Sequence, residues 1–217
     1  MKPIDVVLPC LDEAAALPSV LAAIPPGYRA LVVDNGSSDN SPEIAAAHGA
    51  TVVEEPQRGY GAAVHAGMEA ATAEIVCVLD ADGSLDPAVL PLLVARVDRG
   101  EADLAVGRRV PTSAAAWPWH ARAGNAVIAG LLRRRGVAVH DIAPIRAARR
   151  ADLLALGVAD RRFAYPLELL LKTAEAGWRV REMDVTYRPR AAGTRSKVSG
   201  SLRGTARAVR DMAGVLR

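Results

Sequence analysis

Short apolar runs alternate with longer segments rich in alanine and leucine through the first half of the chain, and this rhythm limits the fold more than any other feature. Four runs are typical of strands, at residues 4–8, 31–33, 51–53 and 75–79. Strands that are apolar on both faces need cover on both faces, so we expect a mostly parallel sheet flanked by helices. With 217 residues, 51% of them hydrophobic, the chain can bury one sizeable core. The predicted architecture is an α/β, Rossmann-like fold in a single domain spanning residues 1–217.

Weaker signals place further elements in the second half of the chain. We expect a helix after Pro87, a fifth strand at 104–106, helices over 120–133 and 165–176, and a late strand over 180–187. The C-terminal segment reads as a basic amphipathic helix. Packing of its apolar face on the domain's own core, on a partner or on a membrane surface stays open. That face comprises Leu202, Ala206, Val209, Met212, Ala213 and Leu216.

Charge is segregated along the chain, although the overall balance is only +3. Residues 1–107 hold 5 Lys and Arg against 16 Asp and Glu, whereas residues 108–217 hold 22 against 8. An arginine-rich composition is the alternative explanation, but it would not by itself move acids into one half. We expect the acidic half to hold a cation and a nucleoside, and the basic half to face phosphates or an anionic membrane surface.

Cellular location is predicted from two absences. No stretch approaches the ~20 consecutive apolar residues that span a bilayer, and the chain runs from its first residues directly into a strand, so we expect neither a signal peptide nor a transmembrane helix. Cys10 and Cys77 lie in apolar runs without metal-ligand spacing, which is typical of buried reduced thiols. These features favour a cytoplasmic location, with peripheral attachment to the inner face of the cell membrane left open.

Acidic segments follow three of the predicted strands. They are Pro9 to Glu13 after the first, Asp34 to Asp39 after the second, and Asp80 to Ser84 after the fourth. Ligands of open parallel sheets bind at the carboxyl ends of strands, so these segments are expected to form one site. Neither a glycine-rich dinucleotide loop nor a Walker loop occurs. Phosphates must therefore be held in another way.

Asp80 and Asp82 are separated by one residue, which places both side chains on the same side of an extended segment. Such a pair can share Mg²⁺ or Mn²⁺, and the ion would also neutralise the charge that grows on a departing diphosphate. The triplet alone is a weak signal because turns are rich in aspartate. Its place after an apolar strand, beside two other acidic strand ends, strengthens the prediction that Asp80 and Asp82 bind the metal.

At this point the chain resembles the inverting family 2 glycosyltransferases with the GT-A fold, particularly the dolichyl- or polyprenyl-phosphate hexose synthase branch. The matching motifs are residues 7–13, 32–39, 59–63 and 80–83. The resemblance implies a sugar-nucleotide donor held by residues 1–107. The donor-site residues that it implies are Pro9, Leu11, Glu13, Asp34, Asn35, Asp39, Arg58, Gly59, Gly61, Asp80, Ala81 and Asp82.

Physical chemistry gives several of these residues a role beside the resemblance. Asp34 can accept a hydrogen bond from a base or a ribose hydroxyl, and glycines at 59 and 61 permit close approach of the backbone. The alternative to a binding role for Asp34 is that residues 34–36 form an ordinary turn, because Asn-Gly is a favoured turn pair. Ser84 stands where many members of the branch carry Gln or a similar polar group, so its coordination of a metal is a weaker option.

Motifs in residues 108–217 resemble the acceptor side of the same branch. Arg108, Arg122 and Arg146 can clamp a donor diphosphate or an acceptor phosphate, because guanidinium pairs with phosphate bidentately. Arg195 and Lys197 can close over the diphosphate and exclude water. Each of these side chains can equally be a solvated surface charge.

The functional hypothesis is a metal-dependent transfer of a hexose from UDP- or GDP-hexose to an acceptor, with inversion at the anomeric carbon. A hydroxyl acceptor needs a general base, for which Asp141 is the first candidate and Glu168 the second. A phosphate acceptor, such as a polyprenyl phosphate, is already ionised and needs none. Small-molecule and lipid-phosphate acceptors both stay open, as do the hexose, the nucleotide base and a homodimer.

Three rival functions compete with this hypothesis. A nucleotidyltransferase would carry a glycine-rich loop with a basic residue where this chain has Pro9 to Glu13. A nucleic-acid-binding module would fit the pI near 9.1, but 4% aromatic residues and the acidic first half count against it. A non-catalytic sugar-nucleotide binder stays open.

Overall fold

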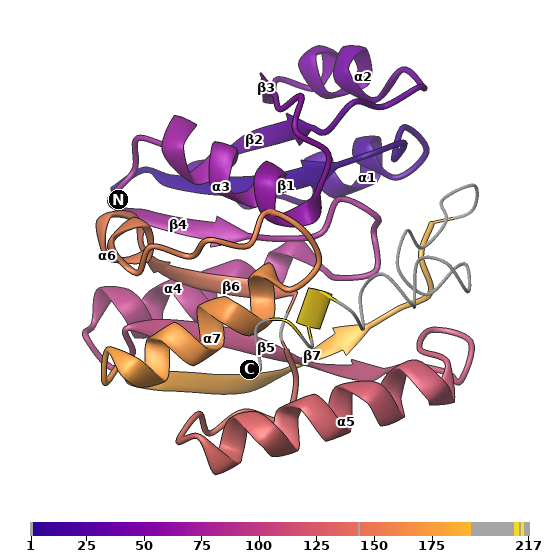
Figure 1. Cartoon of the computed structure of the whole chain (residues 1–217). Helices are drawn as coiled ribbons and strands as arrows, with labels where there is room; N and C mark the ends of the chain where they lie inside the picture. The colour runs from indigo at the N-terminus through magenta and orange to yellow at the C-terminus, as the bar shows by residue number, and fades with distance from the viewer. Residues whose placement is uncertain (1, 143, 192–210, 213, 215–217) are drawn as a thin grey trace.

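A seven-stranded sheet runs through the centre of the molecule in the order β3-β2-β1-β4-β6-β5-β7 (Figure 1). The computed structural model describes residues 2–142, 144–191, 211, 212 and 214. Within them the strands are β1 (Ile4–Cys10), β2 (Tyr28–Asp34), β3 (Thr51–Glu54), β4 (Ile75–Val78), β5 (Leu104–Pro111), β6 (Ile145–Arg149) and β7 (Val180–Tyr187).

The prediction of a mostly parallel sheet is confirmed. Strands β3, β2, β1 and β4 pair in parallel, as do β5 and β7, whereas β6 runs antiparallel to both of its neighbours, β4 and β5. The six parallel strands therefore send their carboxyl ends to one edge of the sheet, where ligands of such sheets bind.

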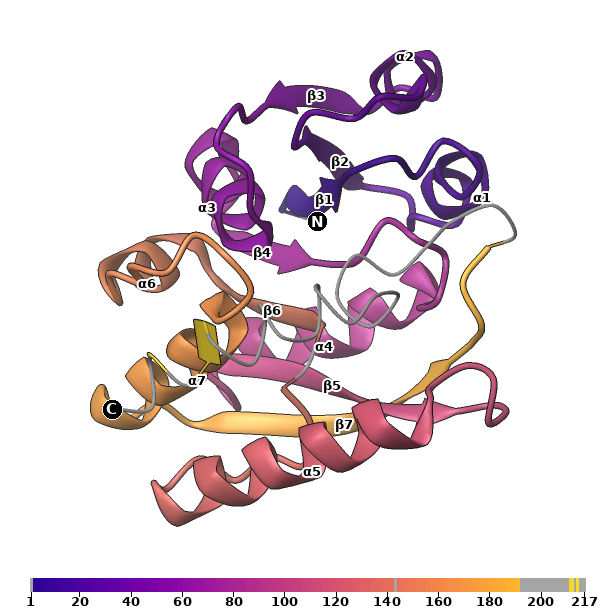
Figure 2. The same cartoon turned by 45° about the vertical axis from the view of Figure 1, so that its right-hand side comes forward.

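Helices cover both faces of the sheet (Figure 2). Apolar side chains of α1, α2 and α4 pack in one core, and those of α3, α6, α7 and the inner side of α5 pack in the other. Neighbouring strand residues alternate between the two cores, with Val6 and Leu8 in the first and Val7 in the second. The helices are α1 (Leu17–Ala22), α2 (Ser41–Ala47), α3 (Tyr60–Ala70), α4 (Leu90–Asp98, after a 3₁₀ turn at Pro87–Val89), α5 (Trp119–Arg134), α6 (Arg150–Ala155) and α7 (Tyr165–Glu175).

The sequence patterns located most elements and missed two. The strand predicted at 104–106 continues to Pro111, and the late strand lies at 180–187 as predicted. Strand β6 and helix α6 were not predicted, because the segment Ile145–Arg149 reads Ile-Arg-Ala-Ala-Arg and carries few β-forming residues. Its place between β4 and β5, with four of its five residues buried, makes it a strand.

The two cysteines are buried free thiols, as predicted. Burial raises the pKa of the Cys10 thiol to about 11, so it stays protonated at neutral pH. Most of the predicted terminal helix, together with Arg195 and Lys197, lies outside the described residues. Of its apolar positions Met212 is described, and it packs against the core beside α7. In the part of the chain that the structure describes, no helix is both long and apolar enough to cross a membrane.

Candidate functional site

The acidic segments after β1, β2 and β4 meet at the carboxyl edge of the sheet, as the sequence predicted. The Cys10 carbonyl accepts a hydrogen bond from the Asn35 N–H at 2.9 Å, and the Val7 carbonyl accepts one from the Leu79 N–H at 3.0 Å. The order β2-β1-β4 thus places the first segment between the other two.

Side-chain hydrogen bonds lock the loop after β1 to the loop after β2. Asp12 Oδ1 accepts from the Ser38 N–H at 2.7 Å, and Ser41 Oγ accepts from the Glu13 N–H at 2.9 Å. Asp39 Oδ1 accepts from the Ser41 hydroxyl at 2.5 Å. Asp12 has a φ of +52°, the one positive value at a non-glycine residue in the described ranges, and such strain persists only where the surroundings impose it. Asp39, which the resemblance implies as a donor-site residue, therefore also holds the loop after β1 in place.

Other predicted donor-site residues line the same edge. Pro9 lies in β1 and is half-buried, Leu11 follows the strand and is half-buried, and Glu13 is 6% exposed. Asp34 ends β2 and accepts hydrogen bonds from the N–H groups of Gly36 and Ser37, at 3.1 Å each. The turn that was the alternative explanation for Asp34 is therefore present, with the carboxylate as its acceptor.

Asn35 ties the next loop to the site. Its side-chain amide donates to the carbonyls of Glu55 and Gln57, and its Oδ1 accepts from the Gly59 N–H at 2.7 Å. The exposed Arg58 side chain lies over Gly36, where an added Cβ would come within 2.9 Å of its Cζ. The two loops are therefore held as one surface at the mouth of the site.

Gly59 and Gly61 permit a close approach, but the partner is the chain's own loop. Gly59 has a φ of +153°, and a Cβ there would lie 2.1 Å from the Arg161 carbonyl oxygen. A Cβ on Gly61 would lie 2.7 Å from Cβ of Tyr165. The Gly61 N–H donates to the Arg162 carbonyl at 3.0 Å. Residues 160–165 fill the space beside these glycines, so the closeness of Gly59 and Gly61 to a donor stays a prediction.

Asp80 and Asp82 follow β4 on a tight loop. Asp82 is 3% exposed, and its Oδ1 accepts from the Ser84 N–H while its Oδ2 lies 2.9 Å from Nη1 of Arg190. Burial, and then the charge of Asp82, raise the pKa of Asp80 to about 6. Two neighbouring carboxylates in so enclosed a place need compensating positive charge, which basic side chains or a metal ion can supply.

The residues present fit a divalent ion in an open site. The described residues contain no cluster of three or more His, Cys, Asp or Glu side chains that could enclose a metal. Mg²⁺ and Mn²⁺, however, are commonly held by one or two carboxylates, with water and substrate phosphates as the remaining ligands. Ser84 adds a buried Oγ that makes no hydrogen bond to the described residues. The chain thus offers part of a coordination shell that a diphosphate can complete.

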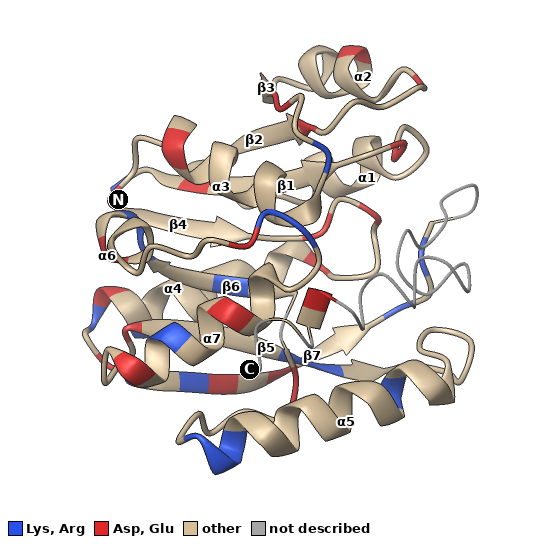
Figure 3. Cartoon of the chain, viewed as in Figure 1, with Lys and Arg blue, Asp and Glu red and all other residues tan. Residues whose placement is uncertain are grey.

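The positive charges of three arginines from the second half of the chain oppose this rise in the pKa of Asp80. They are Arg190, Arg109 and Arg146. Arg146 lies on β6 opposite Val78 and is only 2% exposed. Figure 3 shows the wider pattern, with acidic residues around β1 to β4 and basic residues concentrated around β5 to β7 and α5. The acidic first half and the basic second half of the sequence therefore come together at the strand ends.

Asp141, the first candidate for a general base, is fully buried beneath Arg109. Nε and Nη2 of Arg109 donate to its two oxygens at 2.8 and 2.6 Å, and the Arg109 N–H donates at 2.9 Å. The Arg109 guanidinium stacks on Trp117, 4.0 Å from the ring centre. Sequence reasoning chose Arg108 and missed Arg109, because only the strand register decides which of two adjacent residues faces the site.

The side chains of two further predicted residues, Arg108 and Glu168, make hydrogen bonds within the fold. Arg108 forms a bidentate pair with Asp184 across β5 and β7, at 2.6 and 2.7 Å, and is half-buried. Both oxygens of Glu168 accept backbone N–H groups, from Ala159 and Asp160. Glu168 thereby shapes the loop that packs on Gly59 and Gly61.

A cavity of about 230 Å³ adjoins Arg109 and Asp141. Arg122, on the first turns of α5, is exposed and adds a third guanidinium to its lining. The cavity is suited in charge to an anion. It is lined by Arg108, Arg109, Val110, Pro111, Trp117, Arg122, Asn125, His140 and Asp141.

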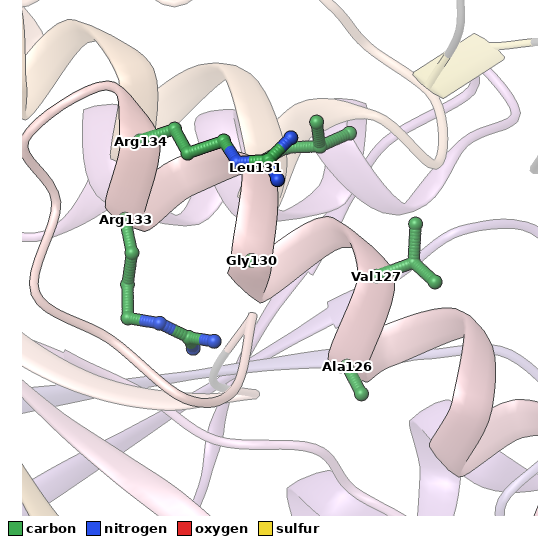
Figure 4. Close-up of a pocket in the computed structure, with 6 residues that line it drawn as sticks. All are labelled: Ala126, Val127, Gly130, Leu131, Arg133 and Arg134. Atoms are coloured by element: carbon green, nitrogen blue, oxygen red, sulfur yellow. The ribbon is translucent and has the colours of Figure 1, made fainter.

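A larger hollow of about 570 Å³ lies on the outer side of α5 (Figure 4). It holds no carboxylate or nucleophile among its described residues, so it is not a candidate for the chemistry. Its lining is Ala126, Val127, Gly130, Leu131, Arg133 and Arg134.

Comparison with known proteins gives consistent matches. The family model described as Glycosyl transferase family 2 matches residues 5–156. An uncharacterized glycosyltransferase of Mycobacterium tuberculosis is 61% identical over 209 residues, which is 96% of this chain and 95% of that protein. A dolichyl-phosphate hexose transferase of Haloferax volcanii is 34% identical over 194 residues, 88% of this chain and 85% of that protein.

Solved structures share the fold. Glucosyl-3-phosphoglycerate synthase from Mycobacterium tuberculosis, in complex with Mn²⁺, uridine diphosphate and phosphoglyceric acid, superposes with a TM-score of 0.75 at 25% identity. The match covers 99% of this chain and 77% of that one. The same synthase in complex with phosphoglyceric acid gives a TM-score of 0.78 at 24% identity, covering 99% and 79%.

Proposed function

The chain belongs to glycosyl transferase family 2, and from that premise we propose that it moves a hexose from a UDP- or GDP-linked donor to an ionised acceptor, with inversion. One observation carries this proposal: the buried carboxylate of Asp82 pairs with Arg190, and the charges of Arg190, Arg109 and Arg146 act on its half-buried neighbour Asp80. A nucleotide diphosphate needs both signs of charge, because a cation must bridge it to carboxylates and further positive charge must stabilise it as it leaves.

The donor would lie across the strand ends that this chain holds rigid. Asp34 and Asp39 border the nucleoside position, and Asp80 and Asp82 border the diphosphate. The solved mycobacterial synthase, crystallised with Mn²⁺ and uridine diphosphate, supports this arrangement through its shared fold. Asp80 and Asp82 would hold the divalent ion. When bound, this ion would neutralise the charge on the leaving diphosphate.

The transfer would be a single displacement. An acceptor oxygen forms a bond to the anomeric carbon as the bond from that carbon to the diphosphate oxygen breaks, and the electron pair leaves with the nucleoside diphosphate. Arg146 is buried on a central strand, so its charge acts on the diphosphate with little screening by water.

An ionised phosphate suits this site better than a hydroxyl as acceptor. Both oxygens of Asp141 accept hydrogen bonds from Arg109, and both oxygens of Glu168 accept backbone N–H groups. We therefore assign Asp141 a positioning role, in which it orients Arg109 toward the cavity beside Arg122. The dolichyl-phosphate name of one relative agrees with a phosphate as acceptor, and the phosphoglyceric acid bound to the solved synthase carries a phosphate beside its hydroxyl.

A lipid acceptor would bring α5 toward the membrane surface. Trp119 is 79% exposed and Val127 65% exposed on its outer side. The helix carries Arg122, Arg133 and Arg134 and no carboxylate, which suits an anionic bilayer. The same face would also serve a soluble enzyme as ordinary surface, so vesicle binding separates the two cases.

Calorimetry with UDP-hexoses and GDP-hexoses, each with and without Mn²⁺, tests the donor. We expect metal-dependent binding of one nucleotide class. Transfer assays with a polyprenyl phosphate and with phosphoglycerate then separate the acceptors. If no sugar nucleotide binds in either condition, the proposed function is wrong; if one binds but no acceptor is glycosylated, the sugar-nucleotide binder becomes the better explanation.

A further inference from the structure

Arg190 occupies the side of Asp82 that a metal ion would need. Its Nη1 lies 2.9 Å from Oδ2 of Asp82, while Oδ1 accepts the N–H of Ser84 at 2.9 Å. Both carboxylate oxygens of Asp82 therefore have a partner within the chain. A divalent ion that binds Oδ2 must take the place of the guanidinium.

The backbone around Arg190 is attached to the same loop independently of this ion pair. The Arg188 N–H donates to the Ser84 carbonyl at 2.8 Å, and the Ala191 N–H donates to the Asp82 carbonyl at 3.1 Å. Leu85 and Tyr187 form a further antiparallel bridge. Since these bonds do not involve the guanidinium, the side chain can move while its backbone stays beside the metal loop.

Of the three arginines that act on Asp80, Arg190 is the one best able to move. Arg109 is committed to Asp141 through a bidentate pair. Arg146 is 2% exposed on a central strand. The Arg190 side chain is 30% exposed and, among the described residues, makes one ion pair, to Asp82. Moving the Arg190 side chain away from Asp82 therefore breaks fewer packing contacts than moving either of the other two.

We propose that Arg190 is an exchangeable counter-ion, which pairs with Asp82 in the metal-free enzyme and turns to the donor diphosphate when a divalent ion displaces it. This inference rests on the proposed function. The displaced guanidinium needs a new anionic partner, and a nucleoside diphosphate provides one. Metal and nucleotide therefore bind with positive coupling, each raising the affinity for the other by the same factor.

Two variants and a matched control test the exchange. In Arg190→Gln the competitor of the metal is gone, whereas Arg190→Lys keeps the charge. Arg188→Gln makes the same change two residues away, at an exposed side chain that lies 3.4 Å from the carboxylate of Asp86. Binding of Mn²⁺ is measured from the electron paramagnetic resonance signal of the free ion, first without and then with UDP.

We expect Arg190→Gln to bind Mn²⁺ alone on the order of tenfold more tightly than the parent, the factor for losing one charged hydrogen bond. The factor by which UDP raises Mn²⁺ affinity should fall by a similar amount. Arg190→Lys and Arg188→Gln should resemble the parent. Thermal melting with added Mn²⁺ gives a second readout, in which Arg190→Gln gains more stability than the parent.

Two failures are distinguishable. A parent enzyme that binds UDP with Mn²⁺, together with an Arg190→Gln variant that binds Mn²⁺ no more tightly, overturns the counter-ion role alone. A parent that binds neither UDP nor GDP in the presence of Mn²⁺ overturns the proposed function itself.

Discussion

At the scale of single residues, the site is a set of charges that compensate one another. Asp82 pairs with Arg190, and Asp141 pairs with Arg109. Each pair joins a carboxylate that is nearly inaccessible to water to a more exposed guanidinium. Removing one member leaves the other uncompensated, so substitutions here change both stability and chemistry.

Asp82→Asn should remove metal-dependent turnover in a protein that still folds, although the loss of the charge opposite Arg190 lowers its stability. The amide keeps the shape and can accept the Ser84 N–H, but it cannot neutralise a divalent ion. We expect turnover to fall at least about 100-fold, the scale on which preorganised charge stabilisation acts. Steady-state assays at several Mn²⁺ concentrations check this, and undiminished turnover would contradict a metal role for Asp82.

Asp141→Asn separates a positioning role from a general base. Loss of the charge opposite a mostly buried Arg109 should lower the free energy of unfolding by about 3 kcal/mol. A positioning role predicts reduced turnover with an unchanged pH profile, because no titrating base has been lost. A general base must be deprotonated to act, so loss of the acidic limb of the profile would instead favour the base.

At the scale of elements, loops from distant parts of the chain hold the strand ends in place. The loop at 160–165 packs on the start of α3, and Asn35 ties the loop after β3 to the loop after β2. Helix α3 gives a prediction about stability that does not depend on the chemistry, and α5 gives a prediction about the acceptor.

Gly59→Ala should lower the free energy of unfolding by about 2–4 kcal/mol, because the new Cβ meets a backbone oxygen and the residue has a φ of +153°. Gly49→Ala is the matched control. Gly49 also has a positive φ, +79°, but nothing lies within 4 Å of an added Cβ. Denaturant melts of both variants should give the smaller loss, about 1 kcal/mol, for Gly49.

Trp119→Ala tests α5 as a membrane-facing element. If the acceptor is lipid-borne, binding to vesicles that contain phosphatidylglycerol should weaken on the order of tenfold and should respond to salt. Leu92→Ala is the control, since Leu92 is 58% exposed on α4. Equal binding by both variants and the parent would count against α5, and a parent that does not bind vesicles would favour a soluble acceptor.

At the scale of the whole molecule, the two halves of the chain contribute opposite charges to one edge of one sheet. The donor and the metal should therefore stabilise the whole fold together. At 100 times the dissociation constant, UDP with Mn²⁺ should add about 2.7 kcal/mol to the free energy of unfolding. Thermal melts with and without a chelator measure this, and a chelator should abolish most of the effect of UDP. An equal UDP effect after chelation would show that the nucleotide binds without the metal.

The sequence alone determined the fold class and the position of the acidic strand ends. The repeated apolar runs require a sheet covered on both faces, and parallel strands necessarily bring their carboxyl ends to one edge. Asp34, Asp80 and Asp82 could therefore be located from the order of residues, because Asp34 and Asp80 directly follow apolar runs and Asp82 lies two residues after Asp80.

Only the tertiary structure decided which basic residues reach that edge. Arg109 and Arg190 come from strands and loops far along the chain, and the register of β5 on β7 selects Arg109 over Arg108. Strand β6 escaped prediction because its burial between β4 and β5 outweighs its weak propensity. Pairing across long sequence separations leaves no periodic signal in the sequence. For this reason the acidic residues could be located from the sequence, whereas the arginines that pair with them could not.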